Sequence, residues 1–256
     1  MDDSHLRSRE LKNRLPGMIH LELGAPGARR AAERGDVAVI IDALRASTTI
    51  CAALMAGAAR VHTVLTVEEA LVWRGDPTCR IAGERGAVRV DGFDFGNSPT
   101  ELLARQEEVR GKTVVLTTTN GTRCIHAALG ASAILIGAPV NATAVARAAL
   151  NLARTNGCEL TLVAAGLHDQ ARDEDVFAQA LLAHRLAALG ALAPGNLPSV
   201  DEQKSLEVFL HAESGQYLCS LGYEVDVRLC AEIDRWSVVP VYHRGYFESL
   251  AELAPR

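Results

Sequence analysis

Val37–Ile41, with the sequence VAVII, is the stretch that decides the fold of this chain. It is an unbroken apolar run between Asp36 and Asp42, and such runs are typical of strands that a sheet buries on both faces. The chain continues at once into Asp42-Ala43-Leu44-Arg45-Ala46-Ser47-Thr48-Thr49, where small, hydroxyl, acidic and basic residues gather. We therefore predict a buried strand that leads through a polar turn, capped by Ser47 or Thr48, into a helix.

The same change from apolar to polar residues occurs twice more. Thr113–Leu116 (TVVL) is followed by Thr117-Thr118-Thr119-Asn120-Gly121-Thr122. A strand predicted over residues 79–82 leads into Gly83-Glu84-Arg85-Gly86 and then into the loop Gly92-Phe93-Asp94-Phe95-Gly96-Asn97-Ser98-Pro99. Ligands of open α/β sheets bind at the carboxyl ends of the strands. Because these residue types suit an anion and a hard metal ion, the pattern predicts a phosphate ester site.

The remaining chain alternates between strand and helix patterns. Further strands are predicted over residues 19–23, 61–65, 133–136, 160–164 and 238–242. Helix starts are indicated by a capping box at Thr66, by Ser98-Pro99, by Asn141 and by Asp173, whereas residues 25–35 are predicted to be a connection. This alternation predicts an α/β fold in three layers, with a mostly parallel sheet and helices on both faces.

The chain is expected to form one domain. Residues 1–17 are polar and mixed in charge, and we predict a disordered tail there. Residues 18–256 are predicted to be a single α/β domain, with a sub-boundary at the linker-like stretch over residues 192–198 (LAPGNLP). The part after Pro198 is either the far edge of the same sheet or a small helical appendage, and we favour the former.

Composition excludes several classes of function. The formal net charge of the 256 residues is -5, without a Lys/Arg cluster, so no nucleic acid partner is expected. No apolar run approaches the ~20 residues that a membrane span needs, and no signal peptide is recognisable. The six cysteines form no C-x-x-C pair, which favours buried thiols in a reducing compartment and thus a cytoplasmic location. A homodimer is a reasonable expectation, although no sequence feature specifies an interface.

Two pairs of an acidic residue and an arginine are the strongest candidates for the chemistry. Asp42 ends a buried strand, where it could bind a metal or act as a nucleophile, and Arg45 could bind a phosphate through two hydrogen bonds. An alternative of equal weight is that Asp42 caps the turn while Arg45 pairs with a surface carboxylate. Glu84 and Arg85 repeat the combination between two glycines, which permit close approach to a ligand.

Other polar residues have weaker support. Thr118, Asn120 and their neighbours could present hydroxyl and N–H groups to an anion, but the local pattern alone favours a β-branched strand that continues into an Asn-Gly turn. Glu174 and Asp175 begin a helix, where the helix dipole alone favours acidic residues. Five further residues are expected to be solvated: His168, His211, Asp226, Glu232 and Asp234.

Common catalytic motifs are missing from the sequence. We find no G-x-x-x-x-G-K-[ST], G-x-G-x-x-G, G-x-S-x-G or H-E-x-x-H, which argues against a P-loop NTPase, a dinucleotide enzyme, a serine hydrolase and a zincin. The remaining set of oxygen ligands and arginines suits Mg²⁺ and a phosphoryl group, because Mg²⁺ prefers one or two carboxylates, water and substrate phosphate.

Taken together, the motifs resemble the 2-phosphosulfolactate phosphatase (ComB) family. The matching stretches are DVAVIIDALRASTTI (36–50), VEEAL (67–71), GERG (83–86), GFDFGNSP (92–99), GKTVVLTTTNGT (111–122), IGAPVNA (136–142), Glu174-Asp175, LGYEVDV (221–227), Asp234 and VVPVY (238–242). The resemblance implies a ComB-like α/β fold and a Mg²⁺-dependent phosphatase. Members of the family hydrolyse 2-phospho-3-sulfolactate to sulfolactate and phosphate, a step towards coenzyme M.

The resemblance also implies a set of site positions, Asp94 among them, and the roles that follow are inferred from the chemistry of the residues. Asp42, Arg45, Glu84 and Arg85 are the predicted catalytic group, and the metal ligands are predicted among Asp42, Glu84, Glu174 and Asp175. Substrate contacts are predicted for Thr48, Asn97, Ser98, Thr118, Asn120, Gly121 and Thr122. The nucleophile is either a metal-bound water or Asp42 itself.

The sequence departs from the family pattern in its C-terminal half. Residues 167–173 contain neither Gly nor Ser, and Ser214-Gly215 stands where a His-Gly is usual. If these segments form the far end of the pocket, phosphate chemistry is retained while specificity is altered. Two alternatives stay open: a non-catalytic protein that binds a phosphorylated metabolite, and a phosphatase of another small metabolite such as a carbohydrate phosphate.

Overall fold

The computed structural model describes residues 17–253, so that the tail predicted over residues 1–17 lies, apart from Gly17, outside the described residues. The elements of the first half are β1 Ile19–Leu23, α2 Gly24–Arg34, β2 Val37–Ile41, α3 Ala46–Met55, β3 Arg60–Thr63, α4 Val67–Leu71, β4 Cys79–Arg85, β5 Val88–Arg89, α5 Pro99–Ala104, α6 Gln106–Val109, β6 Thr113–Thr117 and α7 Gly121–Ala127. Those of the second half are β7 Ala133–Ile136, a 3-10 turn at Pro139–Asn141, α8 Ala142–Asn156, β8 Leu160–Ala164, α9 Asp173–Ala188, a 3-10 turn at Glu202–Lys204, α10 Ser205–His211, α11 Glu213–Ser220, α12 Glu224–Cys230, β9 Pro240–His243, β10 Tyr246–Ser249 and α13 Leu250–Leu253.

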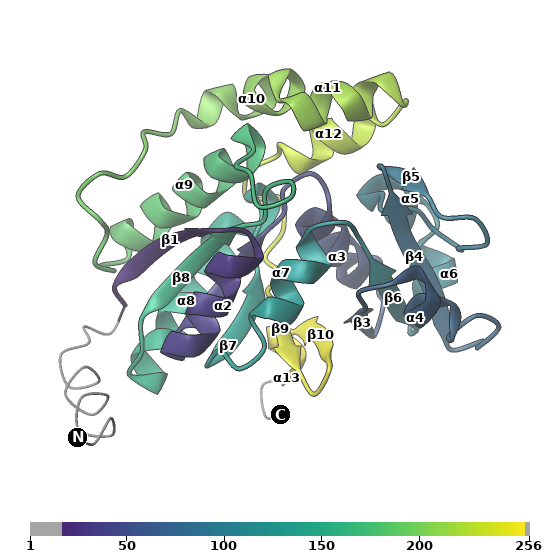
Figure 1. The fold of residues 1–256 in the computed structure, drawn as a ribbon, viewed down its shortest axis with the longest axis horizontal. Coiled ribbons are helices and arrows are strands. Elements are labelled where there is room, and N and C mark those ends of the chain that lie inside the picture. The colour runs from purple at the N-terminus through teal and green to yellow at the C-terminus, as the bar shows by residue number, and fades with distance from the viewer. Residues whose placement is uncertain (1–16, 254–256) are drawn as a thin grey trace.

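The strands between residues 17 and 253 form a ten-stranded sheet in the order β1-β8-β2-β7-β9-β10-β3-β6-β4-β5. It contains two parallel blocks, β1-β8-β2-β7 and β3-β6-β4. The C-terminal hairpin β9–β10 joins them by antiparallel pairing, with Leu135 opposite Val241 and Phe247 opposite Val61. Figure 1 shows the smaller block, with α4 to α6, as a lobe beside the larger one. The predicted mostly parallel α/β sheet is confirmed.

Helices cover both faces of the larger block, and the alternation of side chains along β2 explains why. Val39 and Ile41 face a core cluster that contains residues of α8 and α9. Ala38 and Ile40 face the opposite cluster, to which α2, α3 and α7 contribute. A strand whose two faces are both apolar must be covered twice, so the VAVII run itself requires three layers.

Two expectations about the chain path were wrong. Residues 25–35 are not a connection but belong largely to α2, whose Ala28 and Ala31 are fully buried against the sheet. The buried face of this helix consists of glycine and alanine, so a prediction that relies on bulky apolar residues does not detect it. The segment after Pro198 does not end at the far edge of the sheet, because its hairpin lies in the middle and buries Phe247 completely.

Helix starts were predicted with mixed success. Thr66 forms the expected capping box, and Ser98 caps α5 ahead of Pro99. Neither Ser47 nor Thr48 caps α3, which begins at Ala46. Asn141 stands at the start of α8, but its amide turns back to the carbonyl oxygens of residues 136 and 238 instead of capping the helix.

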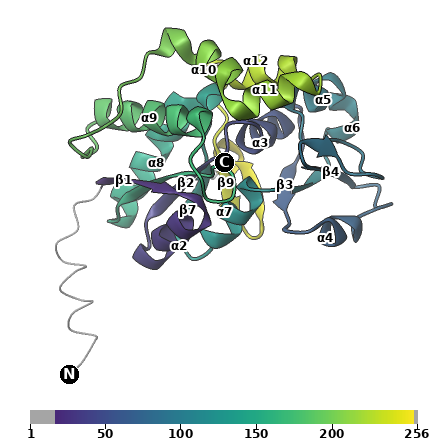
Figure 2. The same cartoon turned by 45° about the horizontal axis from the view of Figure 1, so that its top comes forward.

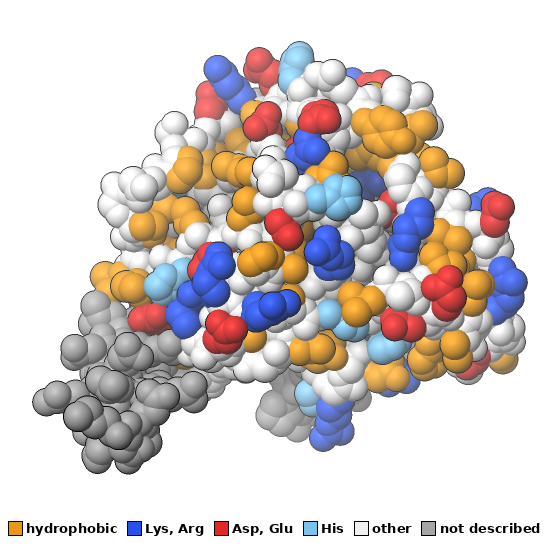
Figure 3. Space-filling model, in the orientation of Figure 1, with side chains coloured by type: hydrophobic (Ala, Val, Ile, Leu, Met, Phe, Trp, Pro, Cys, Tyr) orange, Lys and Arg blue, Asp and Glu red, His pale blue; other side chains and the backbone are white. Residues whose placement is uncertain are grey.

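Helices α10, α11 and α12 lie together across the top of the molecule, above the ends of the central strands (Figures 1 and 2). Within residues 17–253, no helix combines the length and apolar character that a membrane crossing requires. Acidic and basic side chains are mixed over the visible face in Figure 3.

Candidate active site

A cavity of about 480 Å³ opens where β2, β4, β6 and β8 end and where α11 lies across them. The residues that line it are Asp42, Leu44, Arg45, Glu84, Arg85, Gly86, Ala87, Asn97, Thr118, Thr119, Asn120, Gly166, Leu167, His168, Arg172, Glu174, Asp175, Glu213, Ser214, Tyr217 and Leu218. The polar turns singled out by the sequence therefore come together in one place, although their strands belong to both parallel blocks of the sheet.

Asp42 lies at the centre of the acidic wall, with 8% of its surface exposed. Its Oδ1 accepts a hydrogen bond of 3.2 Å from the backbone N–H of Ala46. The N-terminus of α7 packs against the same carboxyl, close enough that a Cβ on Gly121 would lie 2.7 Å from Oδ2. Burial, followed by the negative charges of Glu84 and Glu174, raises the pKa of Asp42 to about 6.

Glu84 connects the two turns that flank the cavity. Its Oε1 accepts hydrogen bonds from the backbone N–H and the hydroxyl of Thr119, and its Oε2 accepts one of 2.8 Å from the N–H of Ala87. The residue before it is glycine at φ +152°, where a Cβ would lie 2.2 Å from the carbonyl oxygen of Thr117. Gly83 thus lets β4 pack closely on β6 and carries Glu84 to the turn.

Glu174 and Asp175 enter from the first turn of α9 and differ in their surroundings. Asp175 accepts hydrogen bonds from the N–H groups of Ala43 (2.7 Å) and Gly166 (2.8 Å), so both its oxygens are engaged. Burial and the neighbouring charges of Asp42 and Glu174 raise the pKa of Asp175 well above its ordinary value. Burial also raises the pKa of Glu174, whose Oε2 is buried without a hydrogen-bond partner among the described residues.

The two predicted arginines line the cavity but are held differently. The Arg45 side chain is 2% exposed; its Nη1 lies 2.8 Å from an oxygen of Asp226, and its Nη2 donates to the carbonyl of Ala87. The guanidinium of Arg85 donates to the carbonyls of Glu84 and Leu65 and to the Thr117 hydroxyl. Asp226 was expected to be a surface charge, which is wrong, because it is 1% exposed.

The predicted substrate contacts divide into two groups. Asn97, Thr118 and Asn120 line the cavity, and the Oδ1 of Asn97 is buried without a hydrogen-bond partner in the described part of the chain. The other four, Thr48, Ser98, Gly121 and Thr122, lie outside the lining of the cavity. Ser98 caps α5 and donates to Asp226, and Thr122 donates to the carbonyl of residue 118, so both support the wall from behind.

The cavity also contains residues that the sequence did not indicate. Arg172 lines it, and Glu213 and Tyr217 reach it from α11. His168 also lines the cavity, although its side chain is exposed as expected. The Tyr217 hydroxyl donates to the carbonyl of Gly86, 131 residues away in sequence. No local pattern signals such a contact, because α11 meets this turn only in the folded chain. His211 lies on α10 outside the cavity, as expected.

The donor set fits a hard divalent cation. Burial and like charges raise the pKa values of three carboxyls here, and a bound cation would relieve that repulsion. Glu174 is the best candidate ligand, since its Oε2 has no hydrogen-bond partner within residues 17–253, whereas Asp42, Glu84 and Asp175 all accept backbone hydrogen bonds. Asp42 is the second candidate, because the negative charges of both Glu84 and Glu174 act on it. One or two carboxylates, with water and substrate oxygens, are what Mg²⁺ ordinarily takes from a protein.

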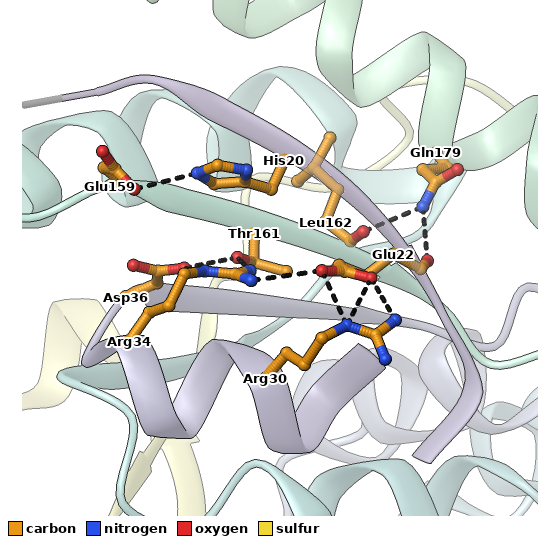
Figure 4. A network of polar contacts seen from close by, with 9 residues as sticks. All are labelled: His20, Glu22, Arg30, Arg34, Asp36, Glu159, Thr161, Leu162 and Gln179. Carbon is orange, nitrogen blue, oxygen red and sulfur yellow. Dashed lines mark hydrogen bonds and ion pairs between the residues drawn. The ribbon is translucent and has the colours of Figure 1, made fainter. Parts of the chain in front are cut away.

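A second cluster, His20, Asp36 and Glu159, brings its side-chain ligand atoms within 4.8 Å of one another. It lies at the amino ends of β2 and β8, away from the cavity. Figure 4 shows that its members are already engaged: Nε2 of His20 lies 2.9 Å from Glu159, and Arg34 lies 2.7 Å from Asp36. Because an arginine supplies the positive charge there, we assign this cluster to an ion-pair network.

The acidic and arginine residues that line this cavity suit a phosphoric monoester hydrolase, and comparison with known proteins assigns the chain to that class. A family model described as 2-phosphosulpholactate phosphatase matches residues 25–245, and the chain belongs to this family. The family resemblance drawn from the motifs is thereby confirmed, as is the enzyme class.

Several relatives share most of their length with this chain. A protein of Symbiobacterium thermophilum is 38% identical over 224 residues, which cover 82% of this chain and 93% of the relative. A protein of Clostridium novyi is 34% identical over 88% of this chain and 97% of its own length. A third, from Deinococcus radiodurans, is 37% identical over 82% of this chain and 89% of its own. All three carry the name probable 2-phosphosulfolactate phosphatase.

Proposed function

We propose that this chain is a Mg²⁺-dependent phosphatase that hydrolyses a small anionic 2-phospho acid, with 2-phospho-3-sulfolactate converted to sulfolactate and phosphate. The observation that carries the proposal is the buried carboxylate cluster of Asp42 and Glu174 at the strand ends, next to Arg45. The names of the relatives support the substrate. We place the enzyme in the cytoplasm, in keeping with its six free thiols.

The charges in the cavity explain why a cation is needed. A phosphoryl dianion that approaches Asp42 and Glu174 would be repelled by both. When bound there, Mg²⁺ would neutralise charge on the transferred phosphoryl group. Arg45 is fixed in the wall of the cavity and offers charge-assisted hydrogen bonds to the phosphoryl oxygens. Thr118 and Asn120 line the cavity from the turn after β6 and would contact the same phosphoryl group.

Asp42 or a water molecule attacks the phosphorus atom. If Asp42 attacks, its bond to phosphorus forms as the ester P–O bond breaks, and the hydroxy acid leaves after its oxygen takes a proton; water then cleaves the phosphoryl-aspartate to phosphate and free Asp42. Direct attack by water breaks the same ester bond but forms no covalent intermediate. Acid quenching with labelled substrate distinguishes the routes: label on the protein, lost in Asp42→Asn, supports the first. Wild-type protein that carries no label when quenched during turnover supports the second, since solvent oxygen can enter phosphate on either route.

The far end of the cavity is suited to the acidic end of the substrate. Arg172 lines it with a side chain that is 19% exposed, and its Nε is buried without a hydrogen-bond partner among residues 17–253. Its partner Glu213 has an 80% exposed side chain, and such solvent-screened ion pairs are weak. A sulfonate or carboxylate could therefore compete with Glu213 for Arg172.

The proposal is tested by phosphate release from a panel of substrates. Phosphosulfolactate, phospholactate and a sugar phosphate are compared at equal concentration, with Mg²⁺ and with EDTA. We expect release that requires Mg²⁺ and is fastest with phosphosulfolactate, and Asp42→Asn serves as the inactive control. Folded protein that releases no phosphate from any of them in Mg²⁺ would contradict the proposal, and undiminished release in EDTA would contradict the metal dependence.

A further inference from the structure

Arg45 is held on three sides by residues that are distant in sequence. One side is Asp226 of α12, whose Oδ2 lies 2.8 Å from Nη1. The second is the carbonyl of Ala87 in the β4–β5 hairpin, which accepts from Nη2 at 2.8 Å. The third is the ring of Tyr223, with its centroid 4.3 Å from the guanidinium carbon. These contacts account for two of the five N–H groups of the guanidinium.

Asp226 is itself fixed in orientation, although it does not line the cavity. Its Oδ1 accepts hydrogen bonds from the Ser98 hydroxyl (2.9 Å), from the backbone N–H of Thr100 (3.1 Å) and from the Thr100 hydroxyl. Its Oδ2 accepts from Arg45. A carboxylate that receives four donors from two directions cannot rotate without breaking several hydrogen bonds, so the arginine it binds is restricted as well.

We propose that Asp226 is a positioning residue that orients Arg45 towards the phosphoryl group, so that α12 completes the active site. The inference rests on the proposed function in one respect, the contact between Arg45 and the phosphoryl oxygens. A free arginine side chain has several rotamers, and a ligand that had to select one of them would bind more weakly. Asp226, Ala87 and Tyr223 remove that freedom before the substrate arrives.

The Arg45–Asp226 ion pair is much more buried than the Arg185–Asp234 pair in the same part of the protein. Arg45 and Asp226 are 2% and 1% exposed. The Arg185–Asp234 pair, which also fastens the C-terminal segment to a helix, is 26% and 32% exposed and contributes nothing to the lining of the cavity. Asp234→Asn is therefore a matched control, since it removes a carboxylate paired with arginine from the same region without affecting Arg45.

The experiment compares wild type with Asp226→Asn, Thr100→Val and Asp234→Asn. KM, kcat and inhibition by inorganic phosphate are measured with Mg²⁺ and phosphosulfolactate, and thermal denaturation checks folding. We expect kcat/KM of Asp226→Asn to fall roughly 10- to 100-fold, as is usual when a group that orients a ligand-binding residue is lost. Phosphate should inhibit this variant correspondingly more weakly. Thr100→Val, which leaves the carboxylate in place, should show a smaller effect in the same direction, and Asp234→Asn none.

A double-mutant cycle of activity distinguishes a positioning role of Asp226 from a purely structural one. In wild type Arg45→Lys should cost much of the activity, whereas in Asp226→Asn the same substitution should cost little, because the orientation is already lost. NMR of the arginine side chains adds a test without substrate: a slowly rotating Arg45 guanidinium in wild type should become mobile in Asp226→Asn.

The outcomes separate the two proposals. Wild-type protein that releases no phosphate would overturn the proposed function, while loss of the slow Arg45 signal in Asp226→Asn would still support the positioning role. An active wild type whose Asp226→Asn variant is folded and keeps kcat/KM within twofold would overturn the inference. Additive effects of Arg45→Lys and Asp226→Asn would overturn it as well, and so would an Asp226→Asn variant that retains the slow Arg45 signal.

Discussion

A Cβ atom on Gly121 would lie 2.7 Å from Oδ2 of Asp42 and 2.9 Å from the Cβ of Ala46. The first residue of α7 therefore rests directly on the carboxyl that ends β2. This contact joins the turn after β6 to the turn after β2, although the two strands belong to different parallel blocks of the sheet. Only a residue without a side chain permits that approach, which explains in physical terms why an Asn-Gly turn is placed here.

Substitution of Gly121 by alanine should therefore displace Asp42. We expect kcat/KM to fall at least about 10-fold and the free energy of unfolding to fall by roughly 1–3 kcal/mol, the usual cost of overpacking. Steady-state kinetics and denaturant unfolding measure the two effects. Gly195→Ala is the control, because a Cβ at Gly195 meets nothing within 4 Å and its φ is not in the left-handed region. Equal behaviour of the two variants would show that the contact does not matter.

The acidic cluster should make the metal-free protein less stable as the pH rises. Asp42 has a pKa of about 6 in the folded chain and an ordinary value of 3.8, so the folded state binds the proton more tightly. Stability from such a group is fully present below pH ~4 and is lost as the pH rises through ~6, and a shift of this size amounts to roughly 3 kcal/mol. The raised pKa values of Glu174 and Asp175 act in the same direction.

Unfolding in EDTA between pH 4 and pH 8 measures this effect against Asp42→Asn, which lacks the titrating group. The difference in unfolding free energy between wild type and the variant should decrease as the pH rises. Taking this difference cancels the opposite contribution of groups such as Glu22, whose pKa is lowered by its arginine partners despite partial burial. Mg²⁺ at pH 7 should restore the lost stability to wild type only. A difference that does not change with pH would contradict the raised pKa of Asp42.

Sequence reasoning located the site well where a strand and its turn are contiguous. The VAVII run led directly to Asp42, and the predicted strand over residues 160–164 matches β8. Alternation of apolar residues is a local property, so it survives in a single sequence without knowledge of the partners. The predicted mostly parallel sheet with helices on both faces followed from the same local patterns.

Apart from helix α2, what the sequence missed depends on partners far along the chain. Asp226 looked like a surface charge because its partner Arg45 is 181 residues away. Arg172 immediately precedes α9 and pairs with Glu213 of α11, 41 residues further along the chain, so no local pattern predicts its place in the cavity. The part after Pro198, with one predicted strand over residues 238–242, was assigned to the far edge of the sheet because nothing in its sequence shows that it ends in a hairpin that joins two parallel blocks. In each of these three cases, a contact between distant parts of the chain determines the position, and the local sequence does not contain it.

Loss of the charge on Glu174 should separate metal binding from stability. Its Oε2 is buried without a hydrogen-bond partner within residues 17–253, so the carboxylate destabilises the metal-free protein. Glu174→Gln should therefore be at least as stable as wild type in EDTA, yet gain no stability from Mg²⁺ and lose about 100-fold or more in kcat. Thermal denaturation with and without Mg²⁺ measures this, with the exposed Glu207→Gln as control. A variant still stabilised by Mg²⁺ would exclude Glu174 as a ligand.

Arg172 should determine which 2-phospho acid is preferred. Its buried Nε and its weakly held partner Glu213 leave it able to bind the sulfonate end of phosphosulfolactate. Phospholactate lacks that sulfonate, so Arg172→Gln should lower kcat/KM for phosphosulfolactate more than for phospholactate. A charge-assisted hydrogen bond is worth about 1.5–3 kcal/mol, which predicts a roughly 10- to 100-fold change in the ratio of the two values.

The control for this change is Arg228→Gln, which removes a half-exposed arginine of α12 that pairs with Glu224 outside the cavity. It should leave the ratio unchanged. If Arg172→Gln lowers both values equally, Arg172 contacts a part that the two substrates share, such as the carboxylate or the phosphoryl group. If neither value changes, the sulfonate is bound elsewhere, and the altered stretch over residues 167–173 does not decide specificity through its arginine.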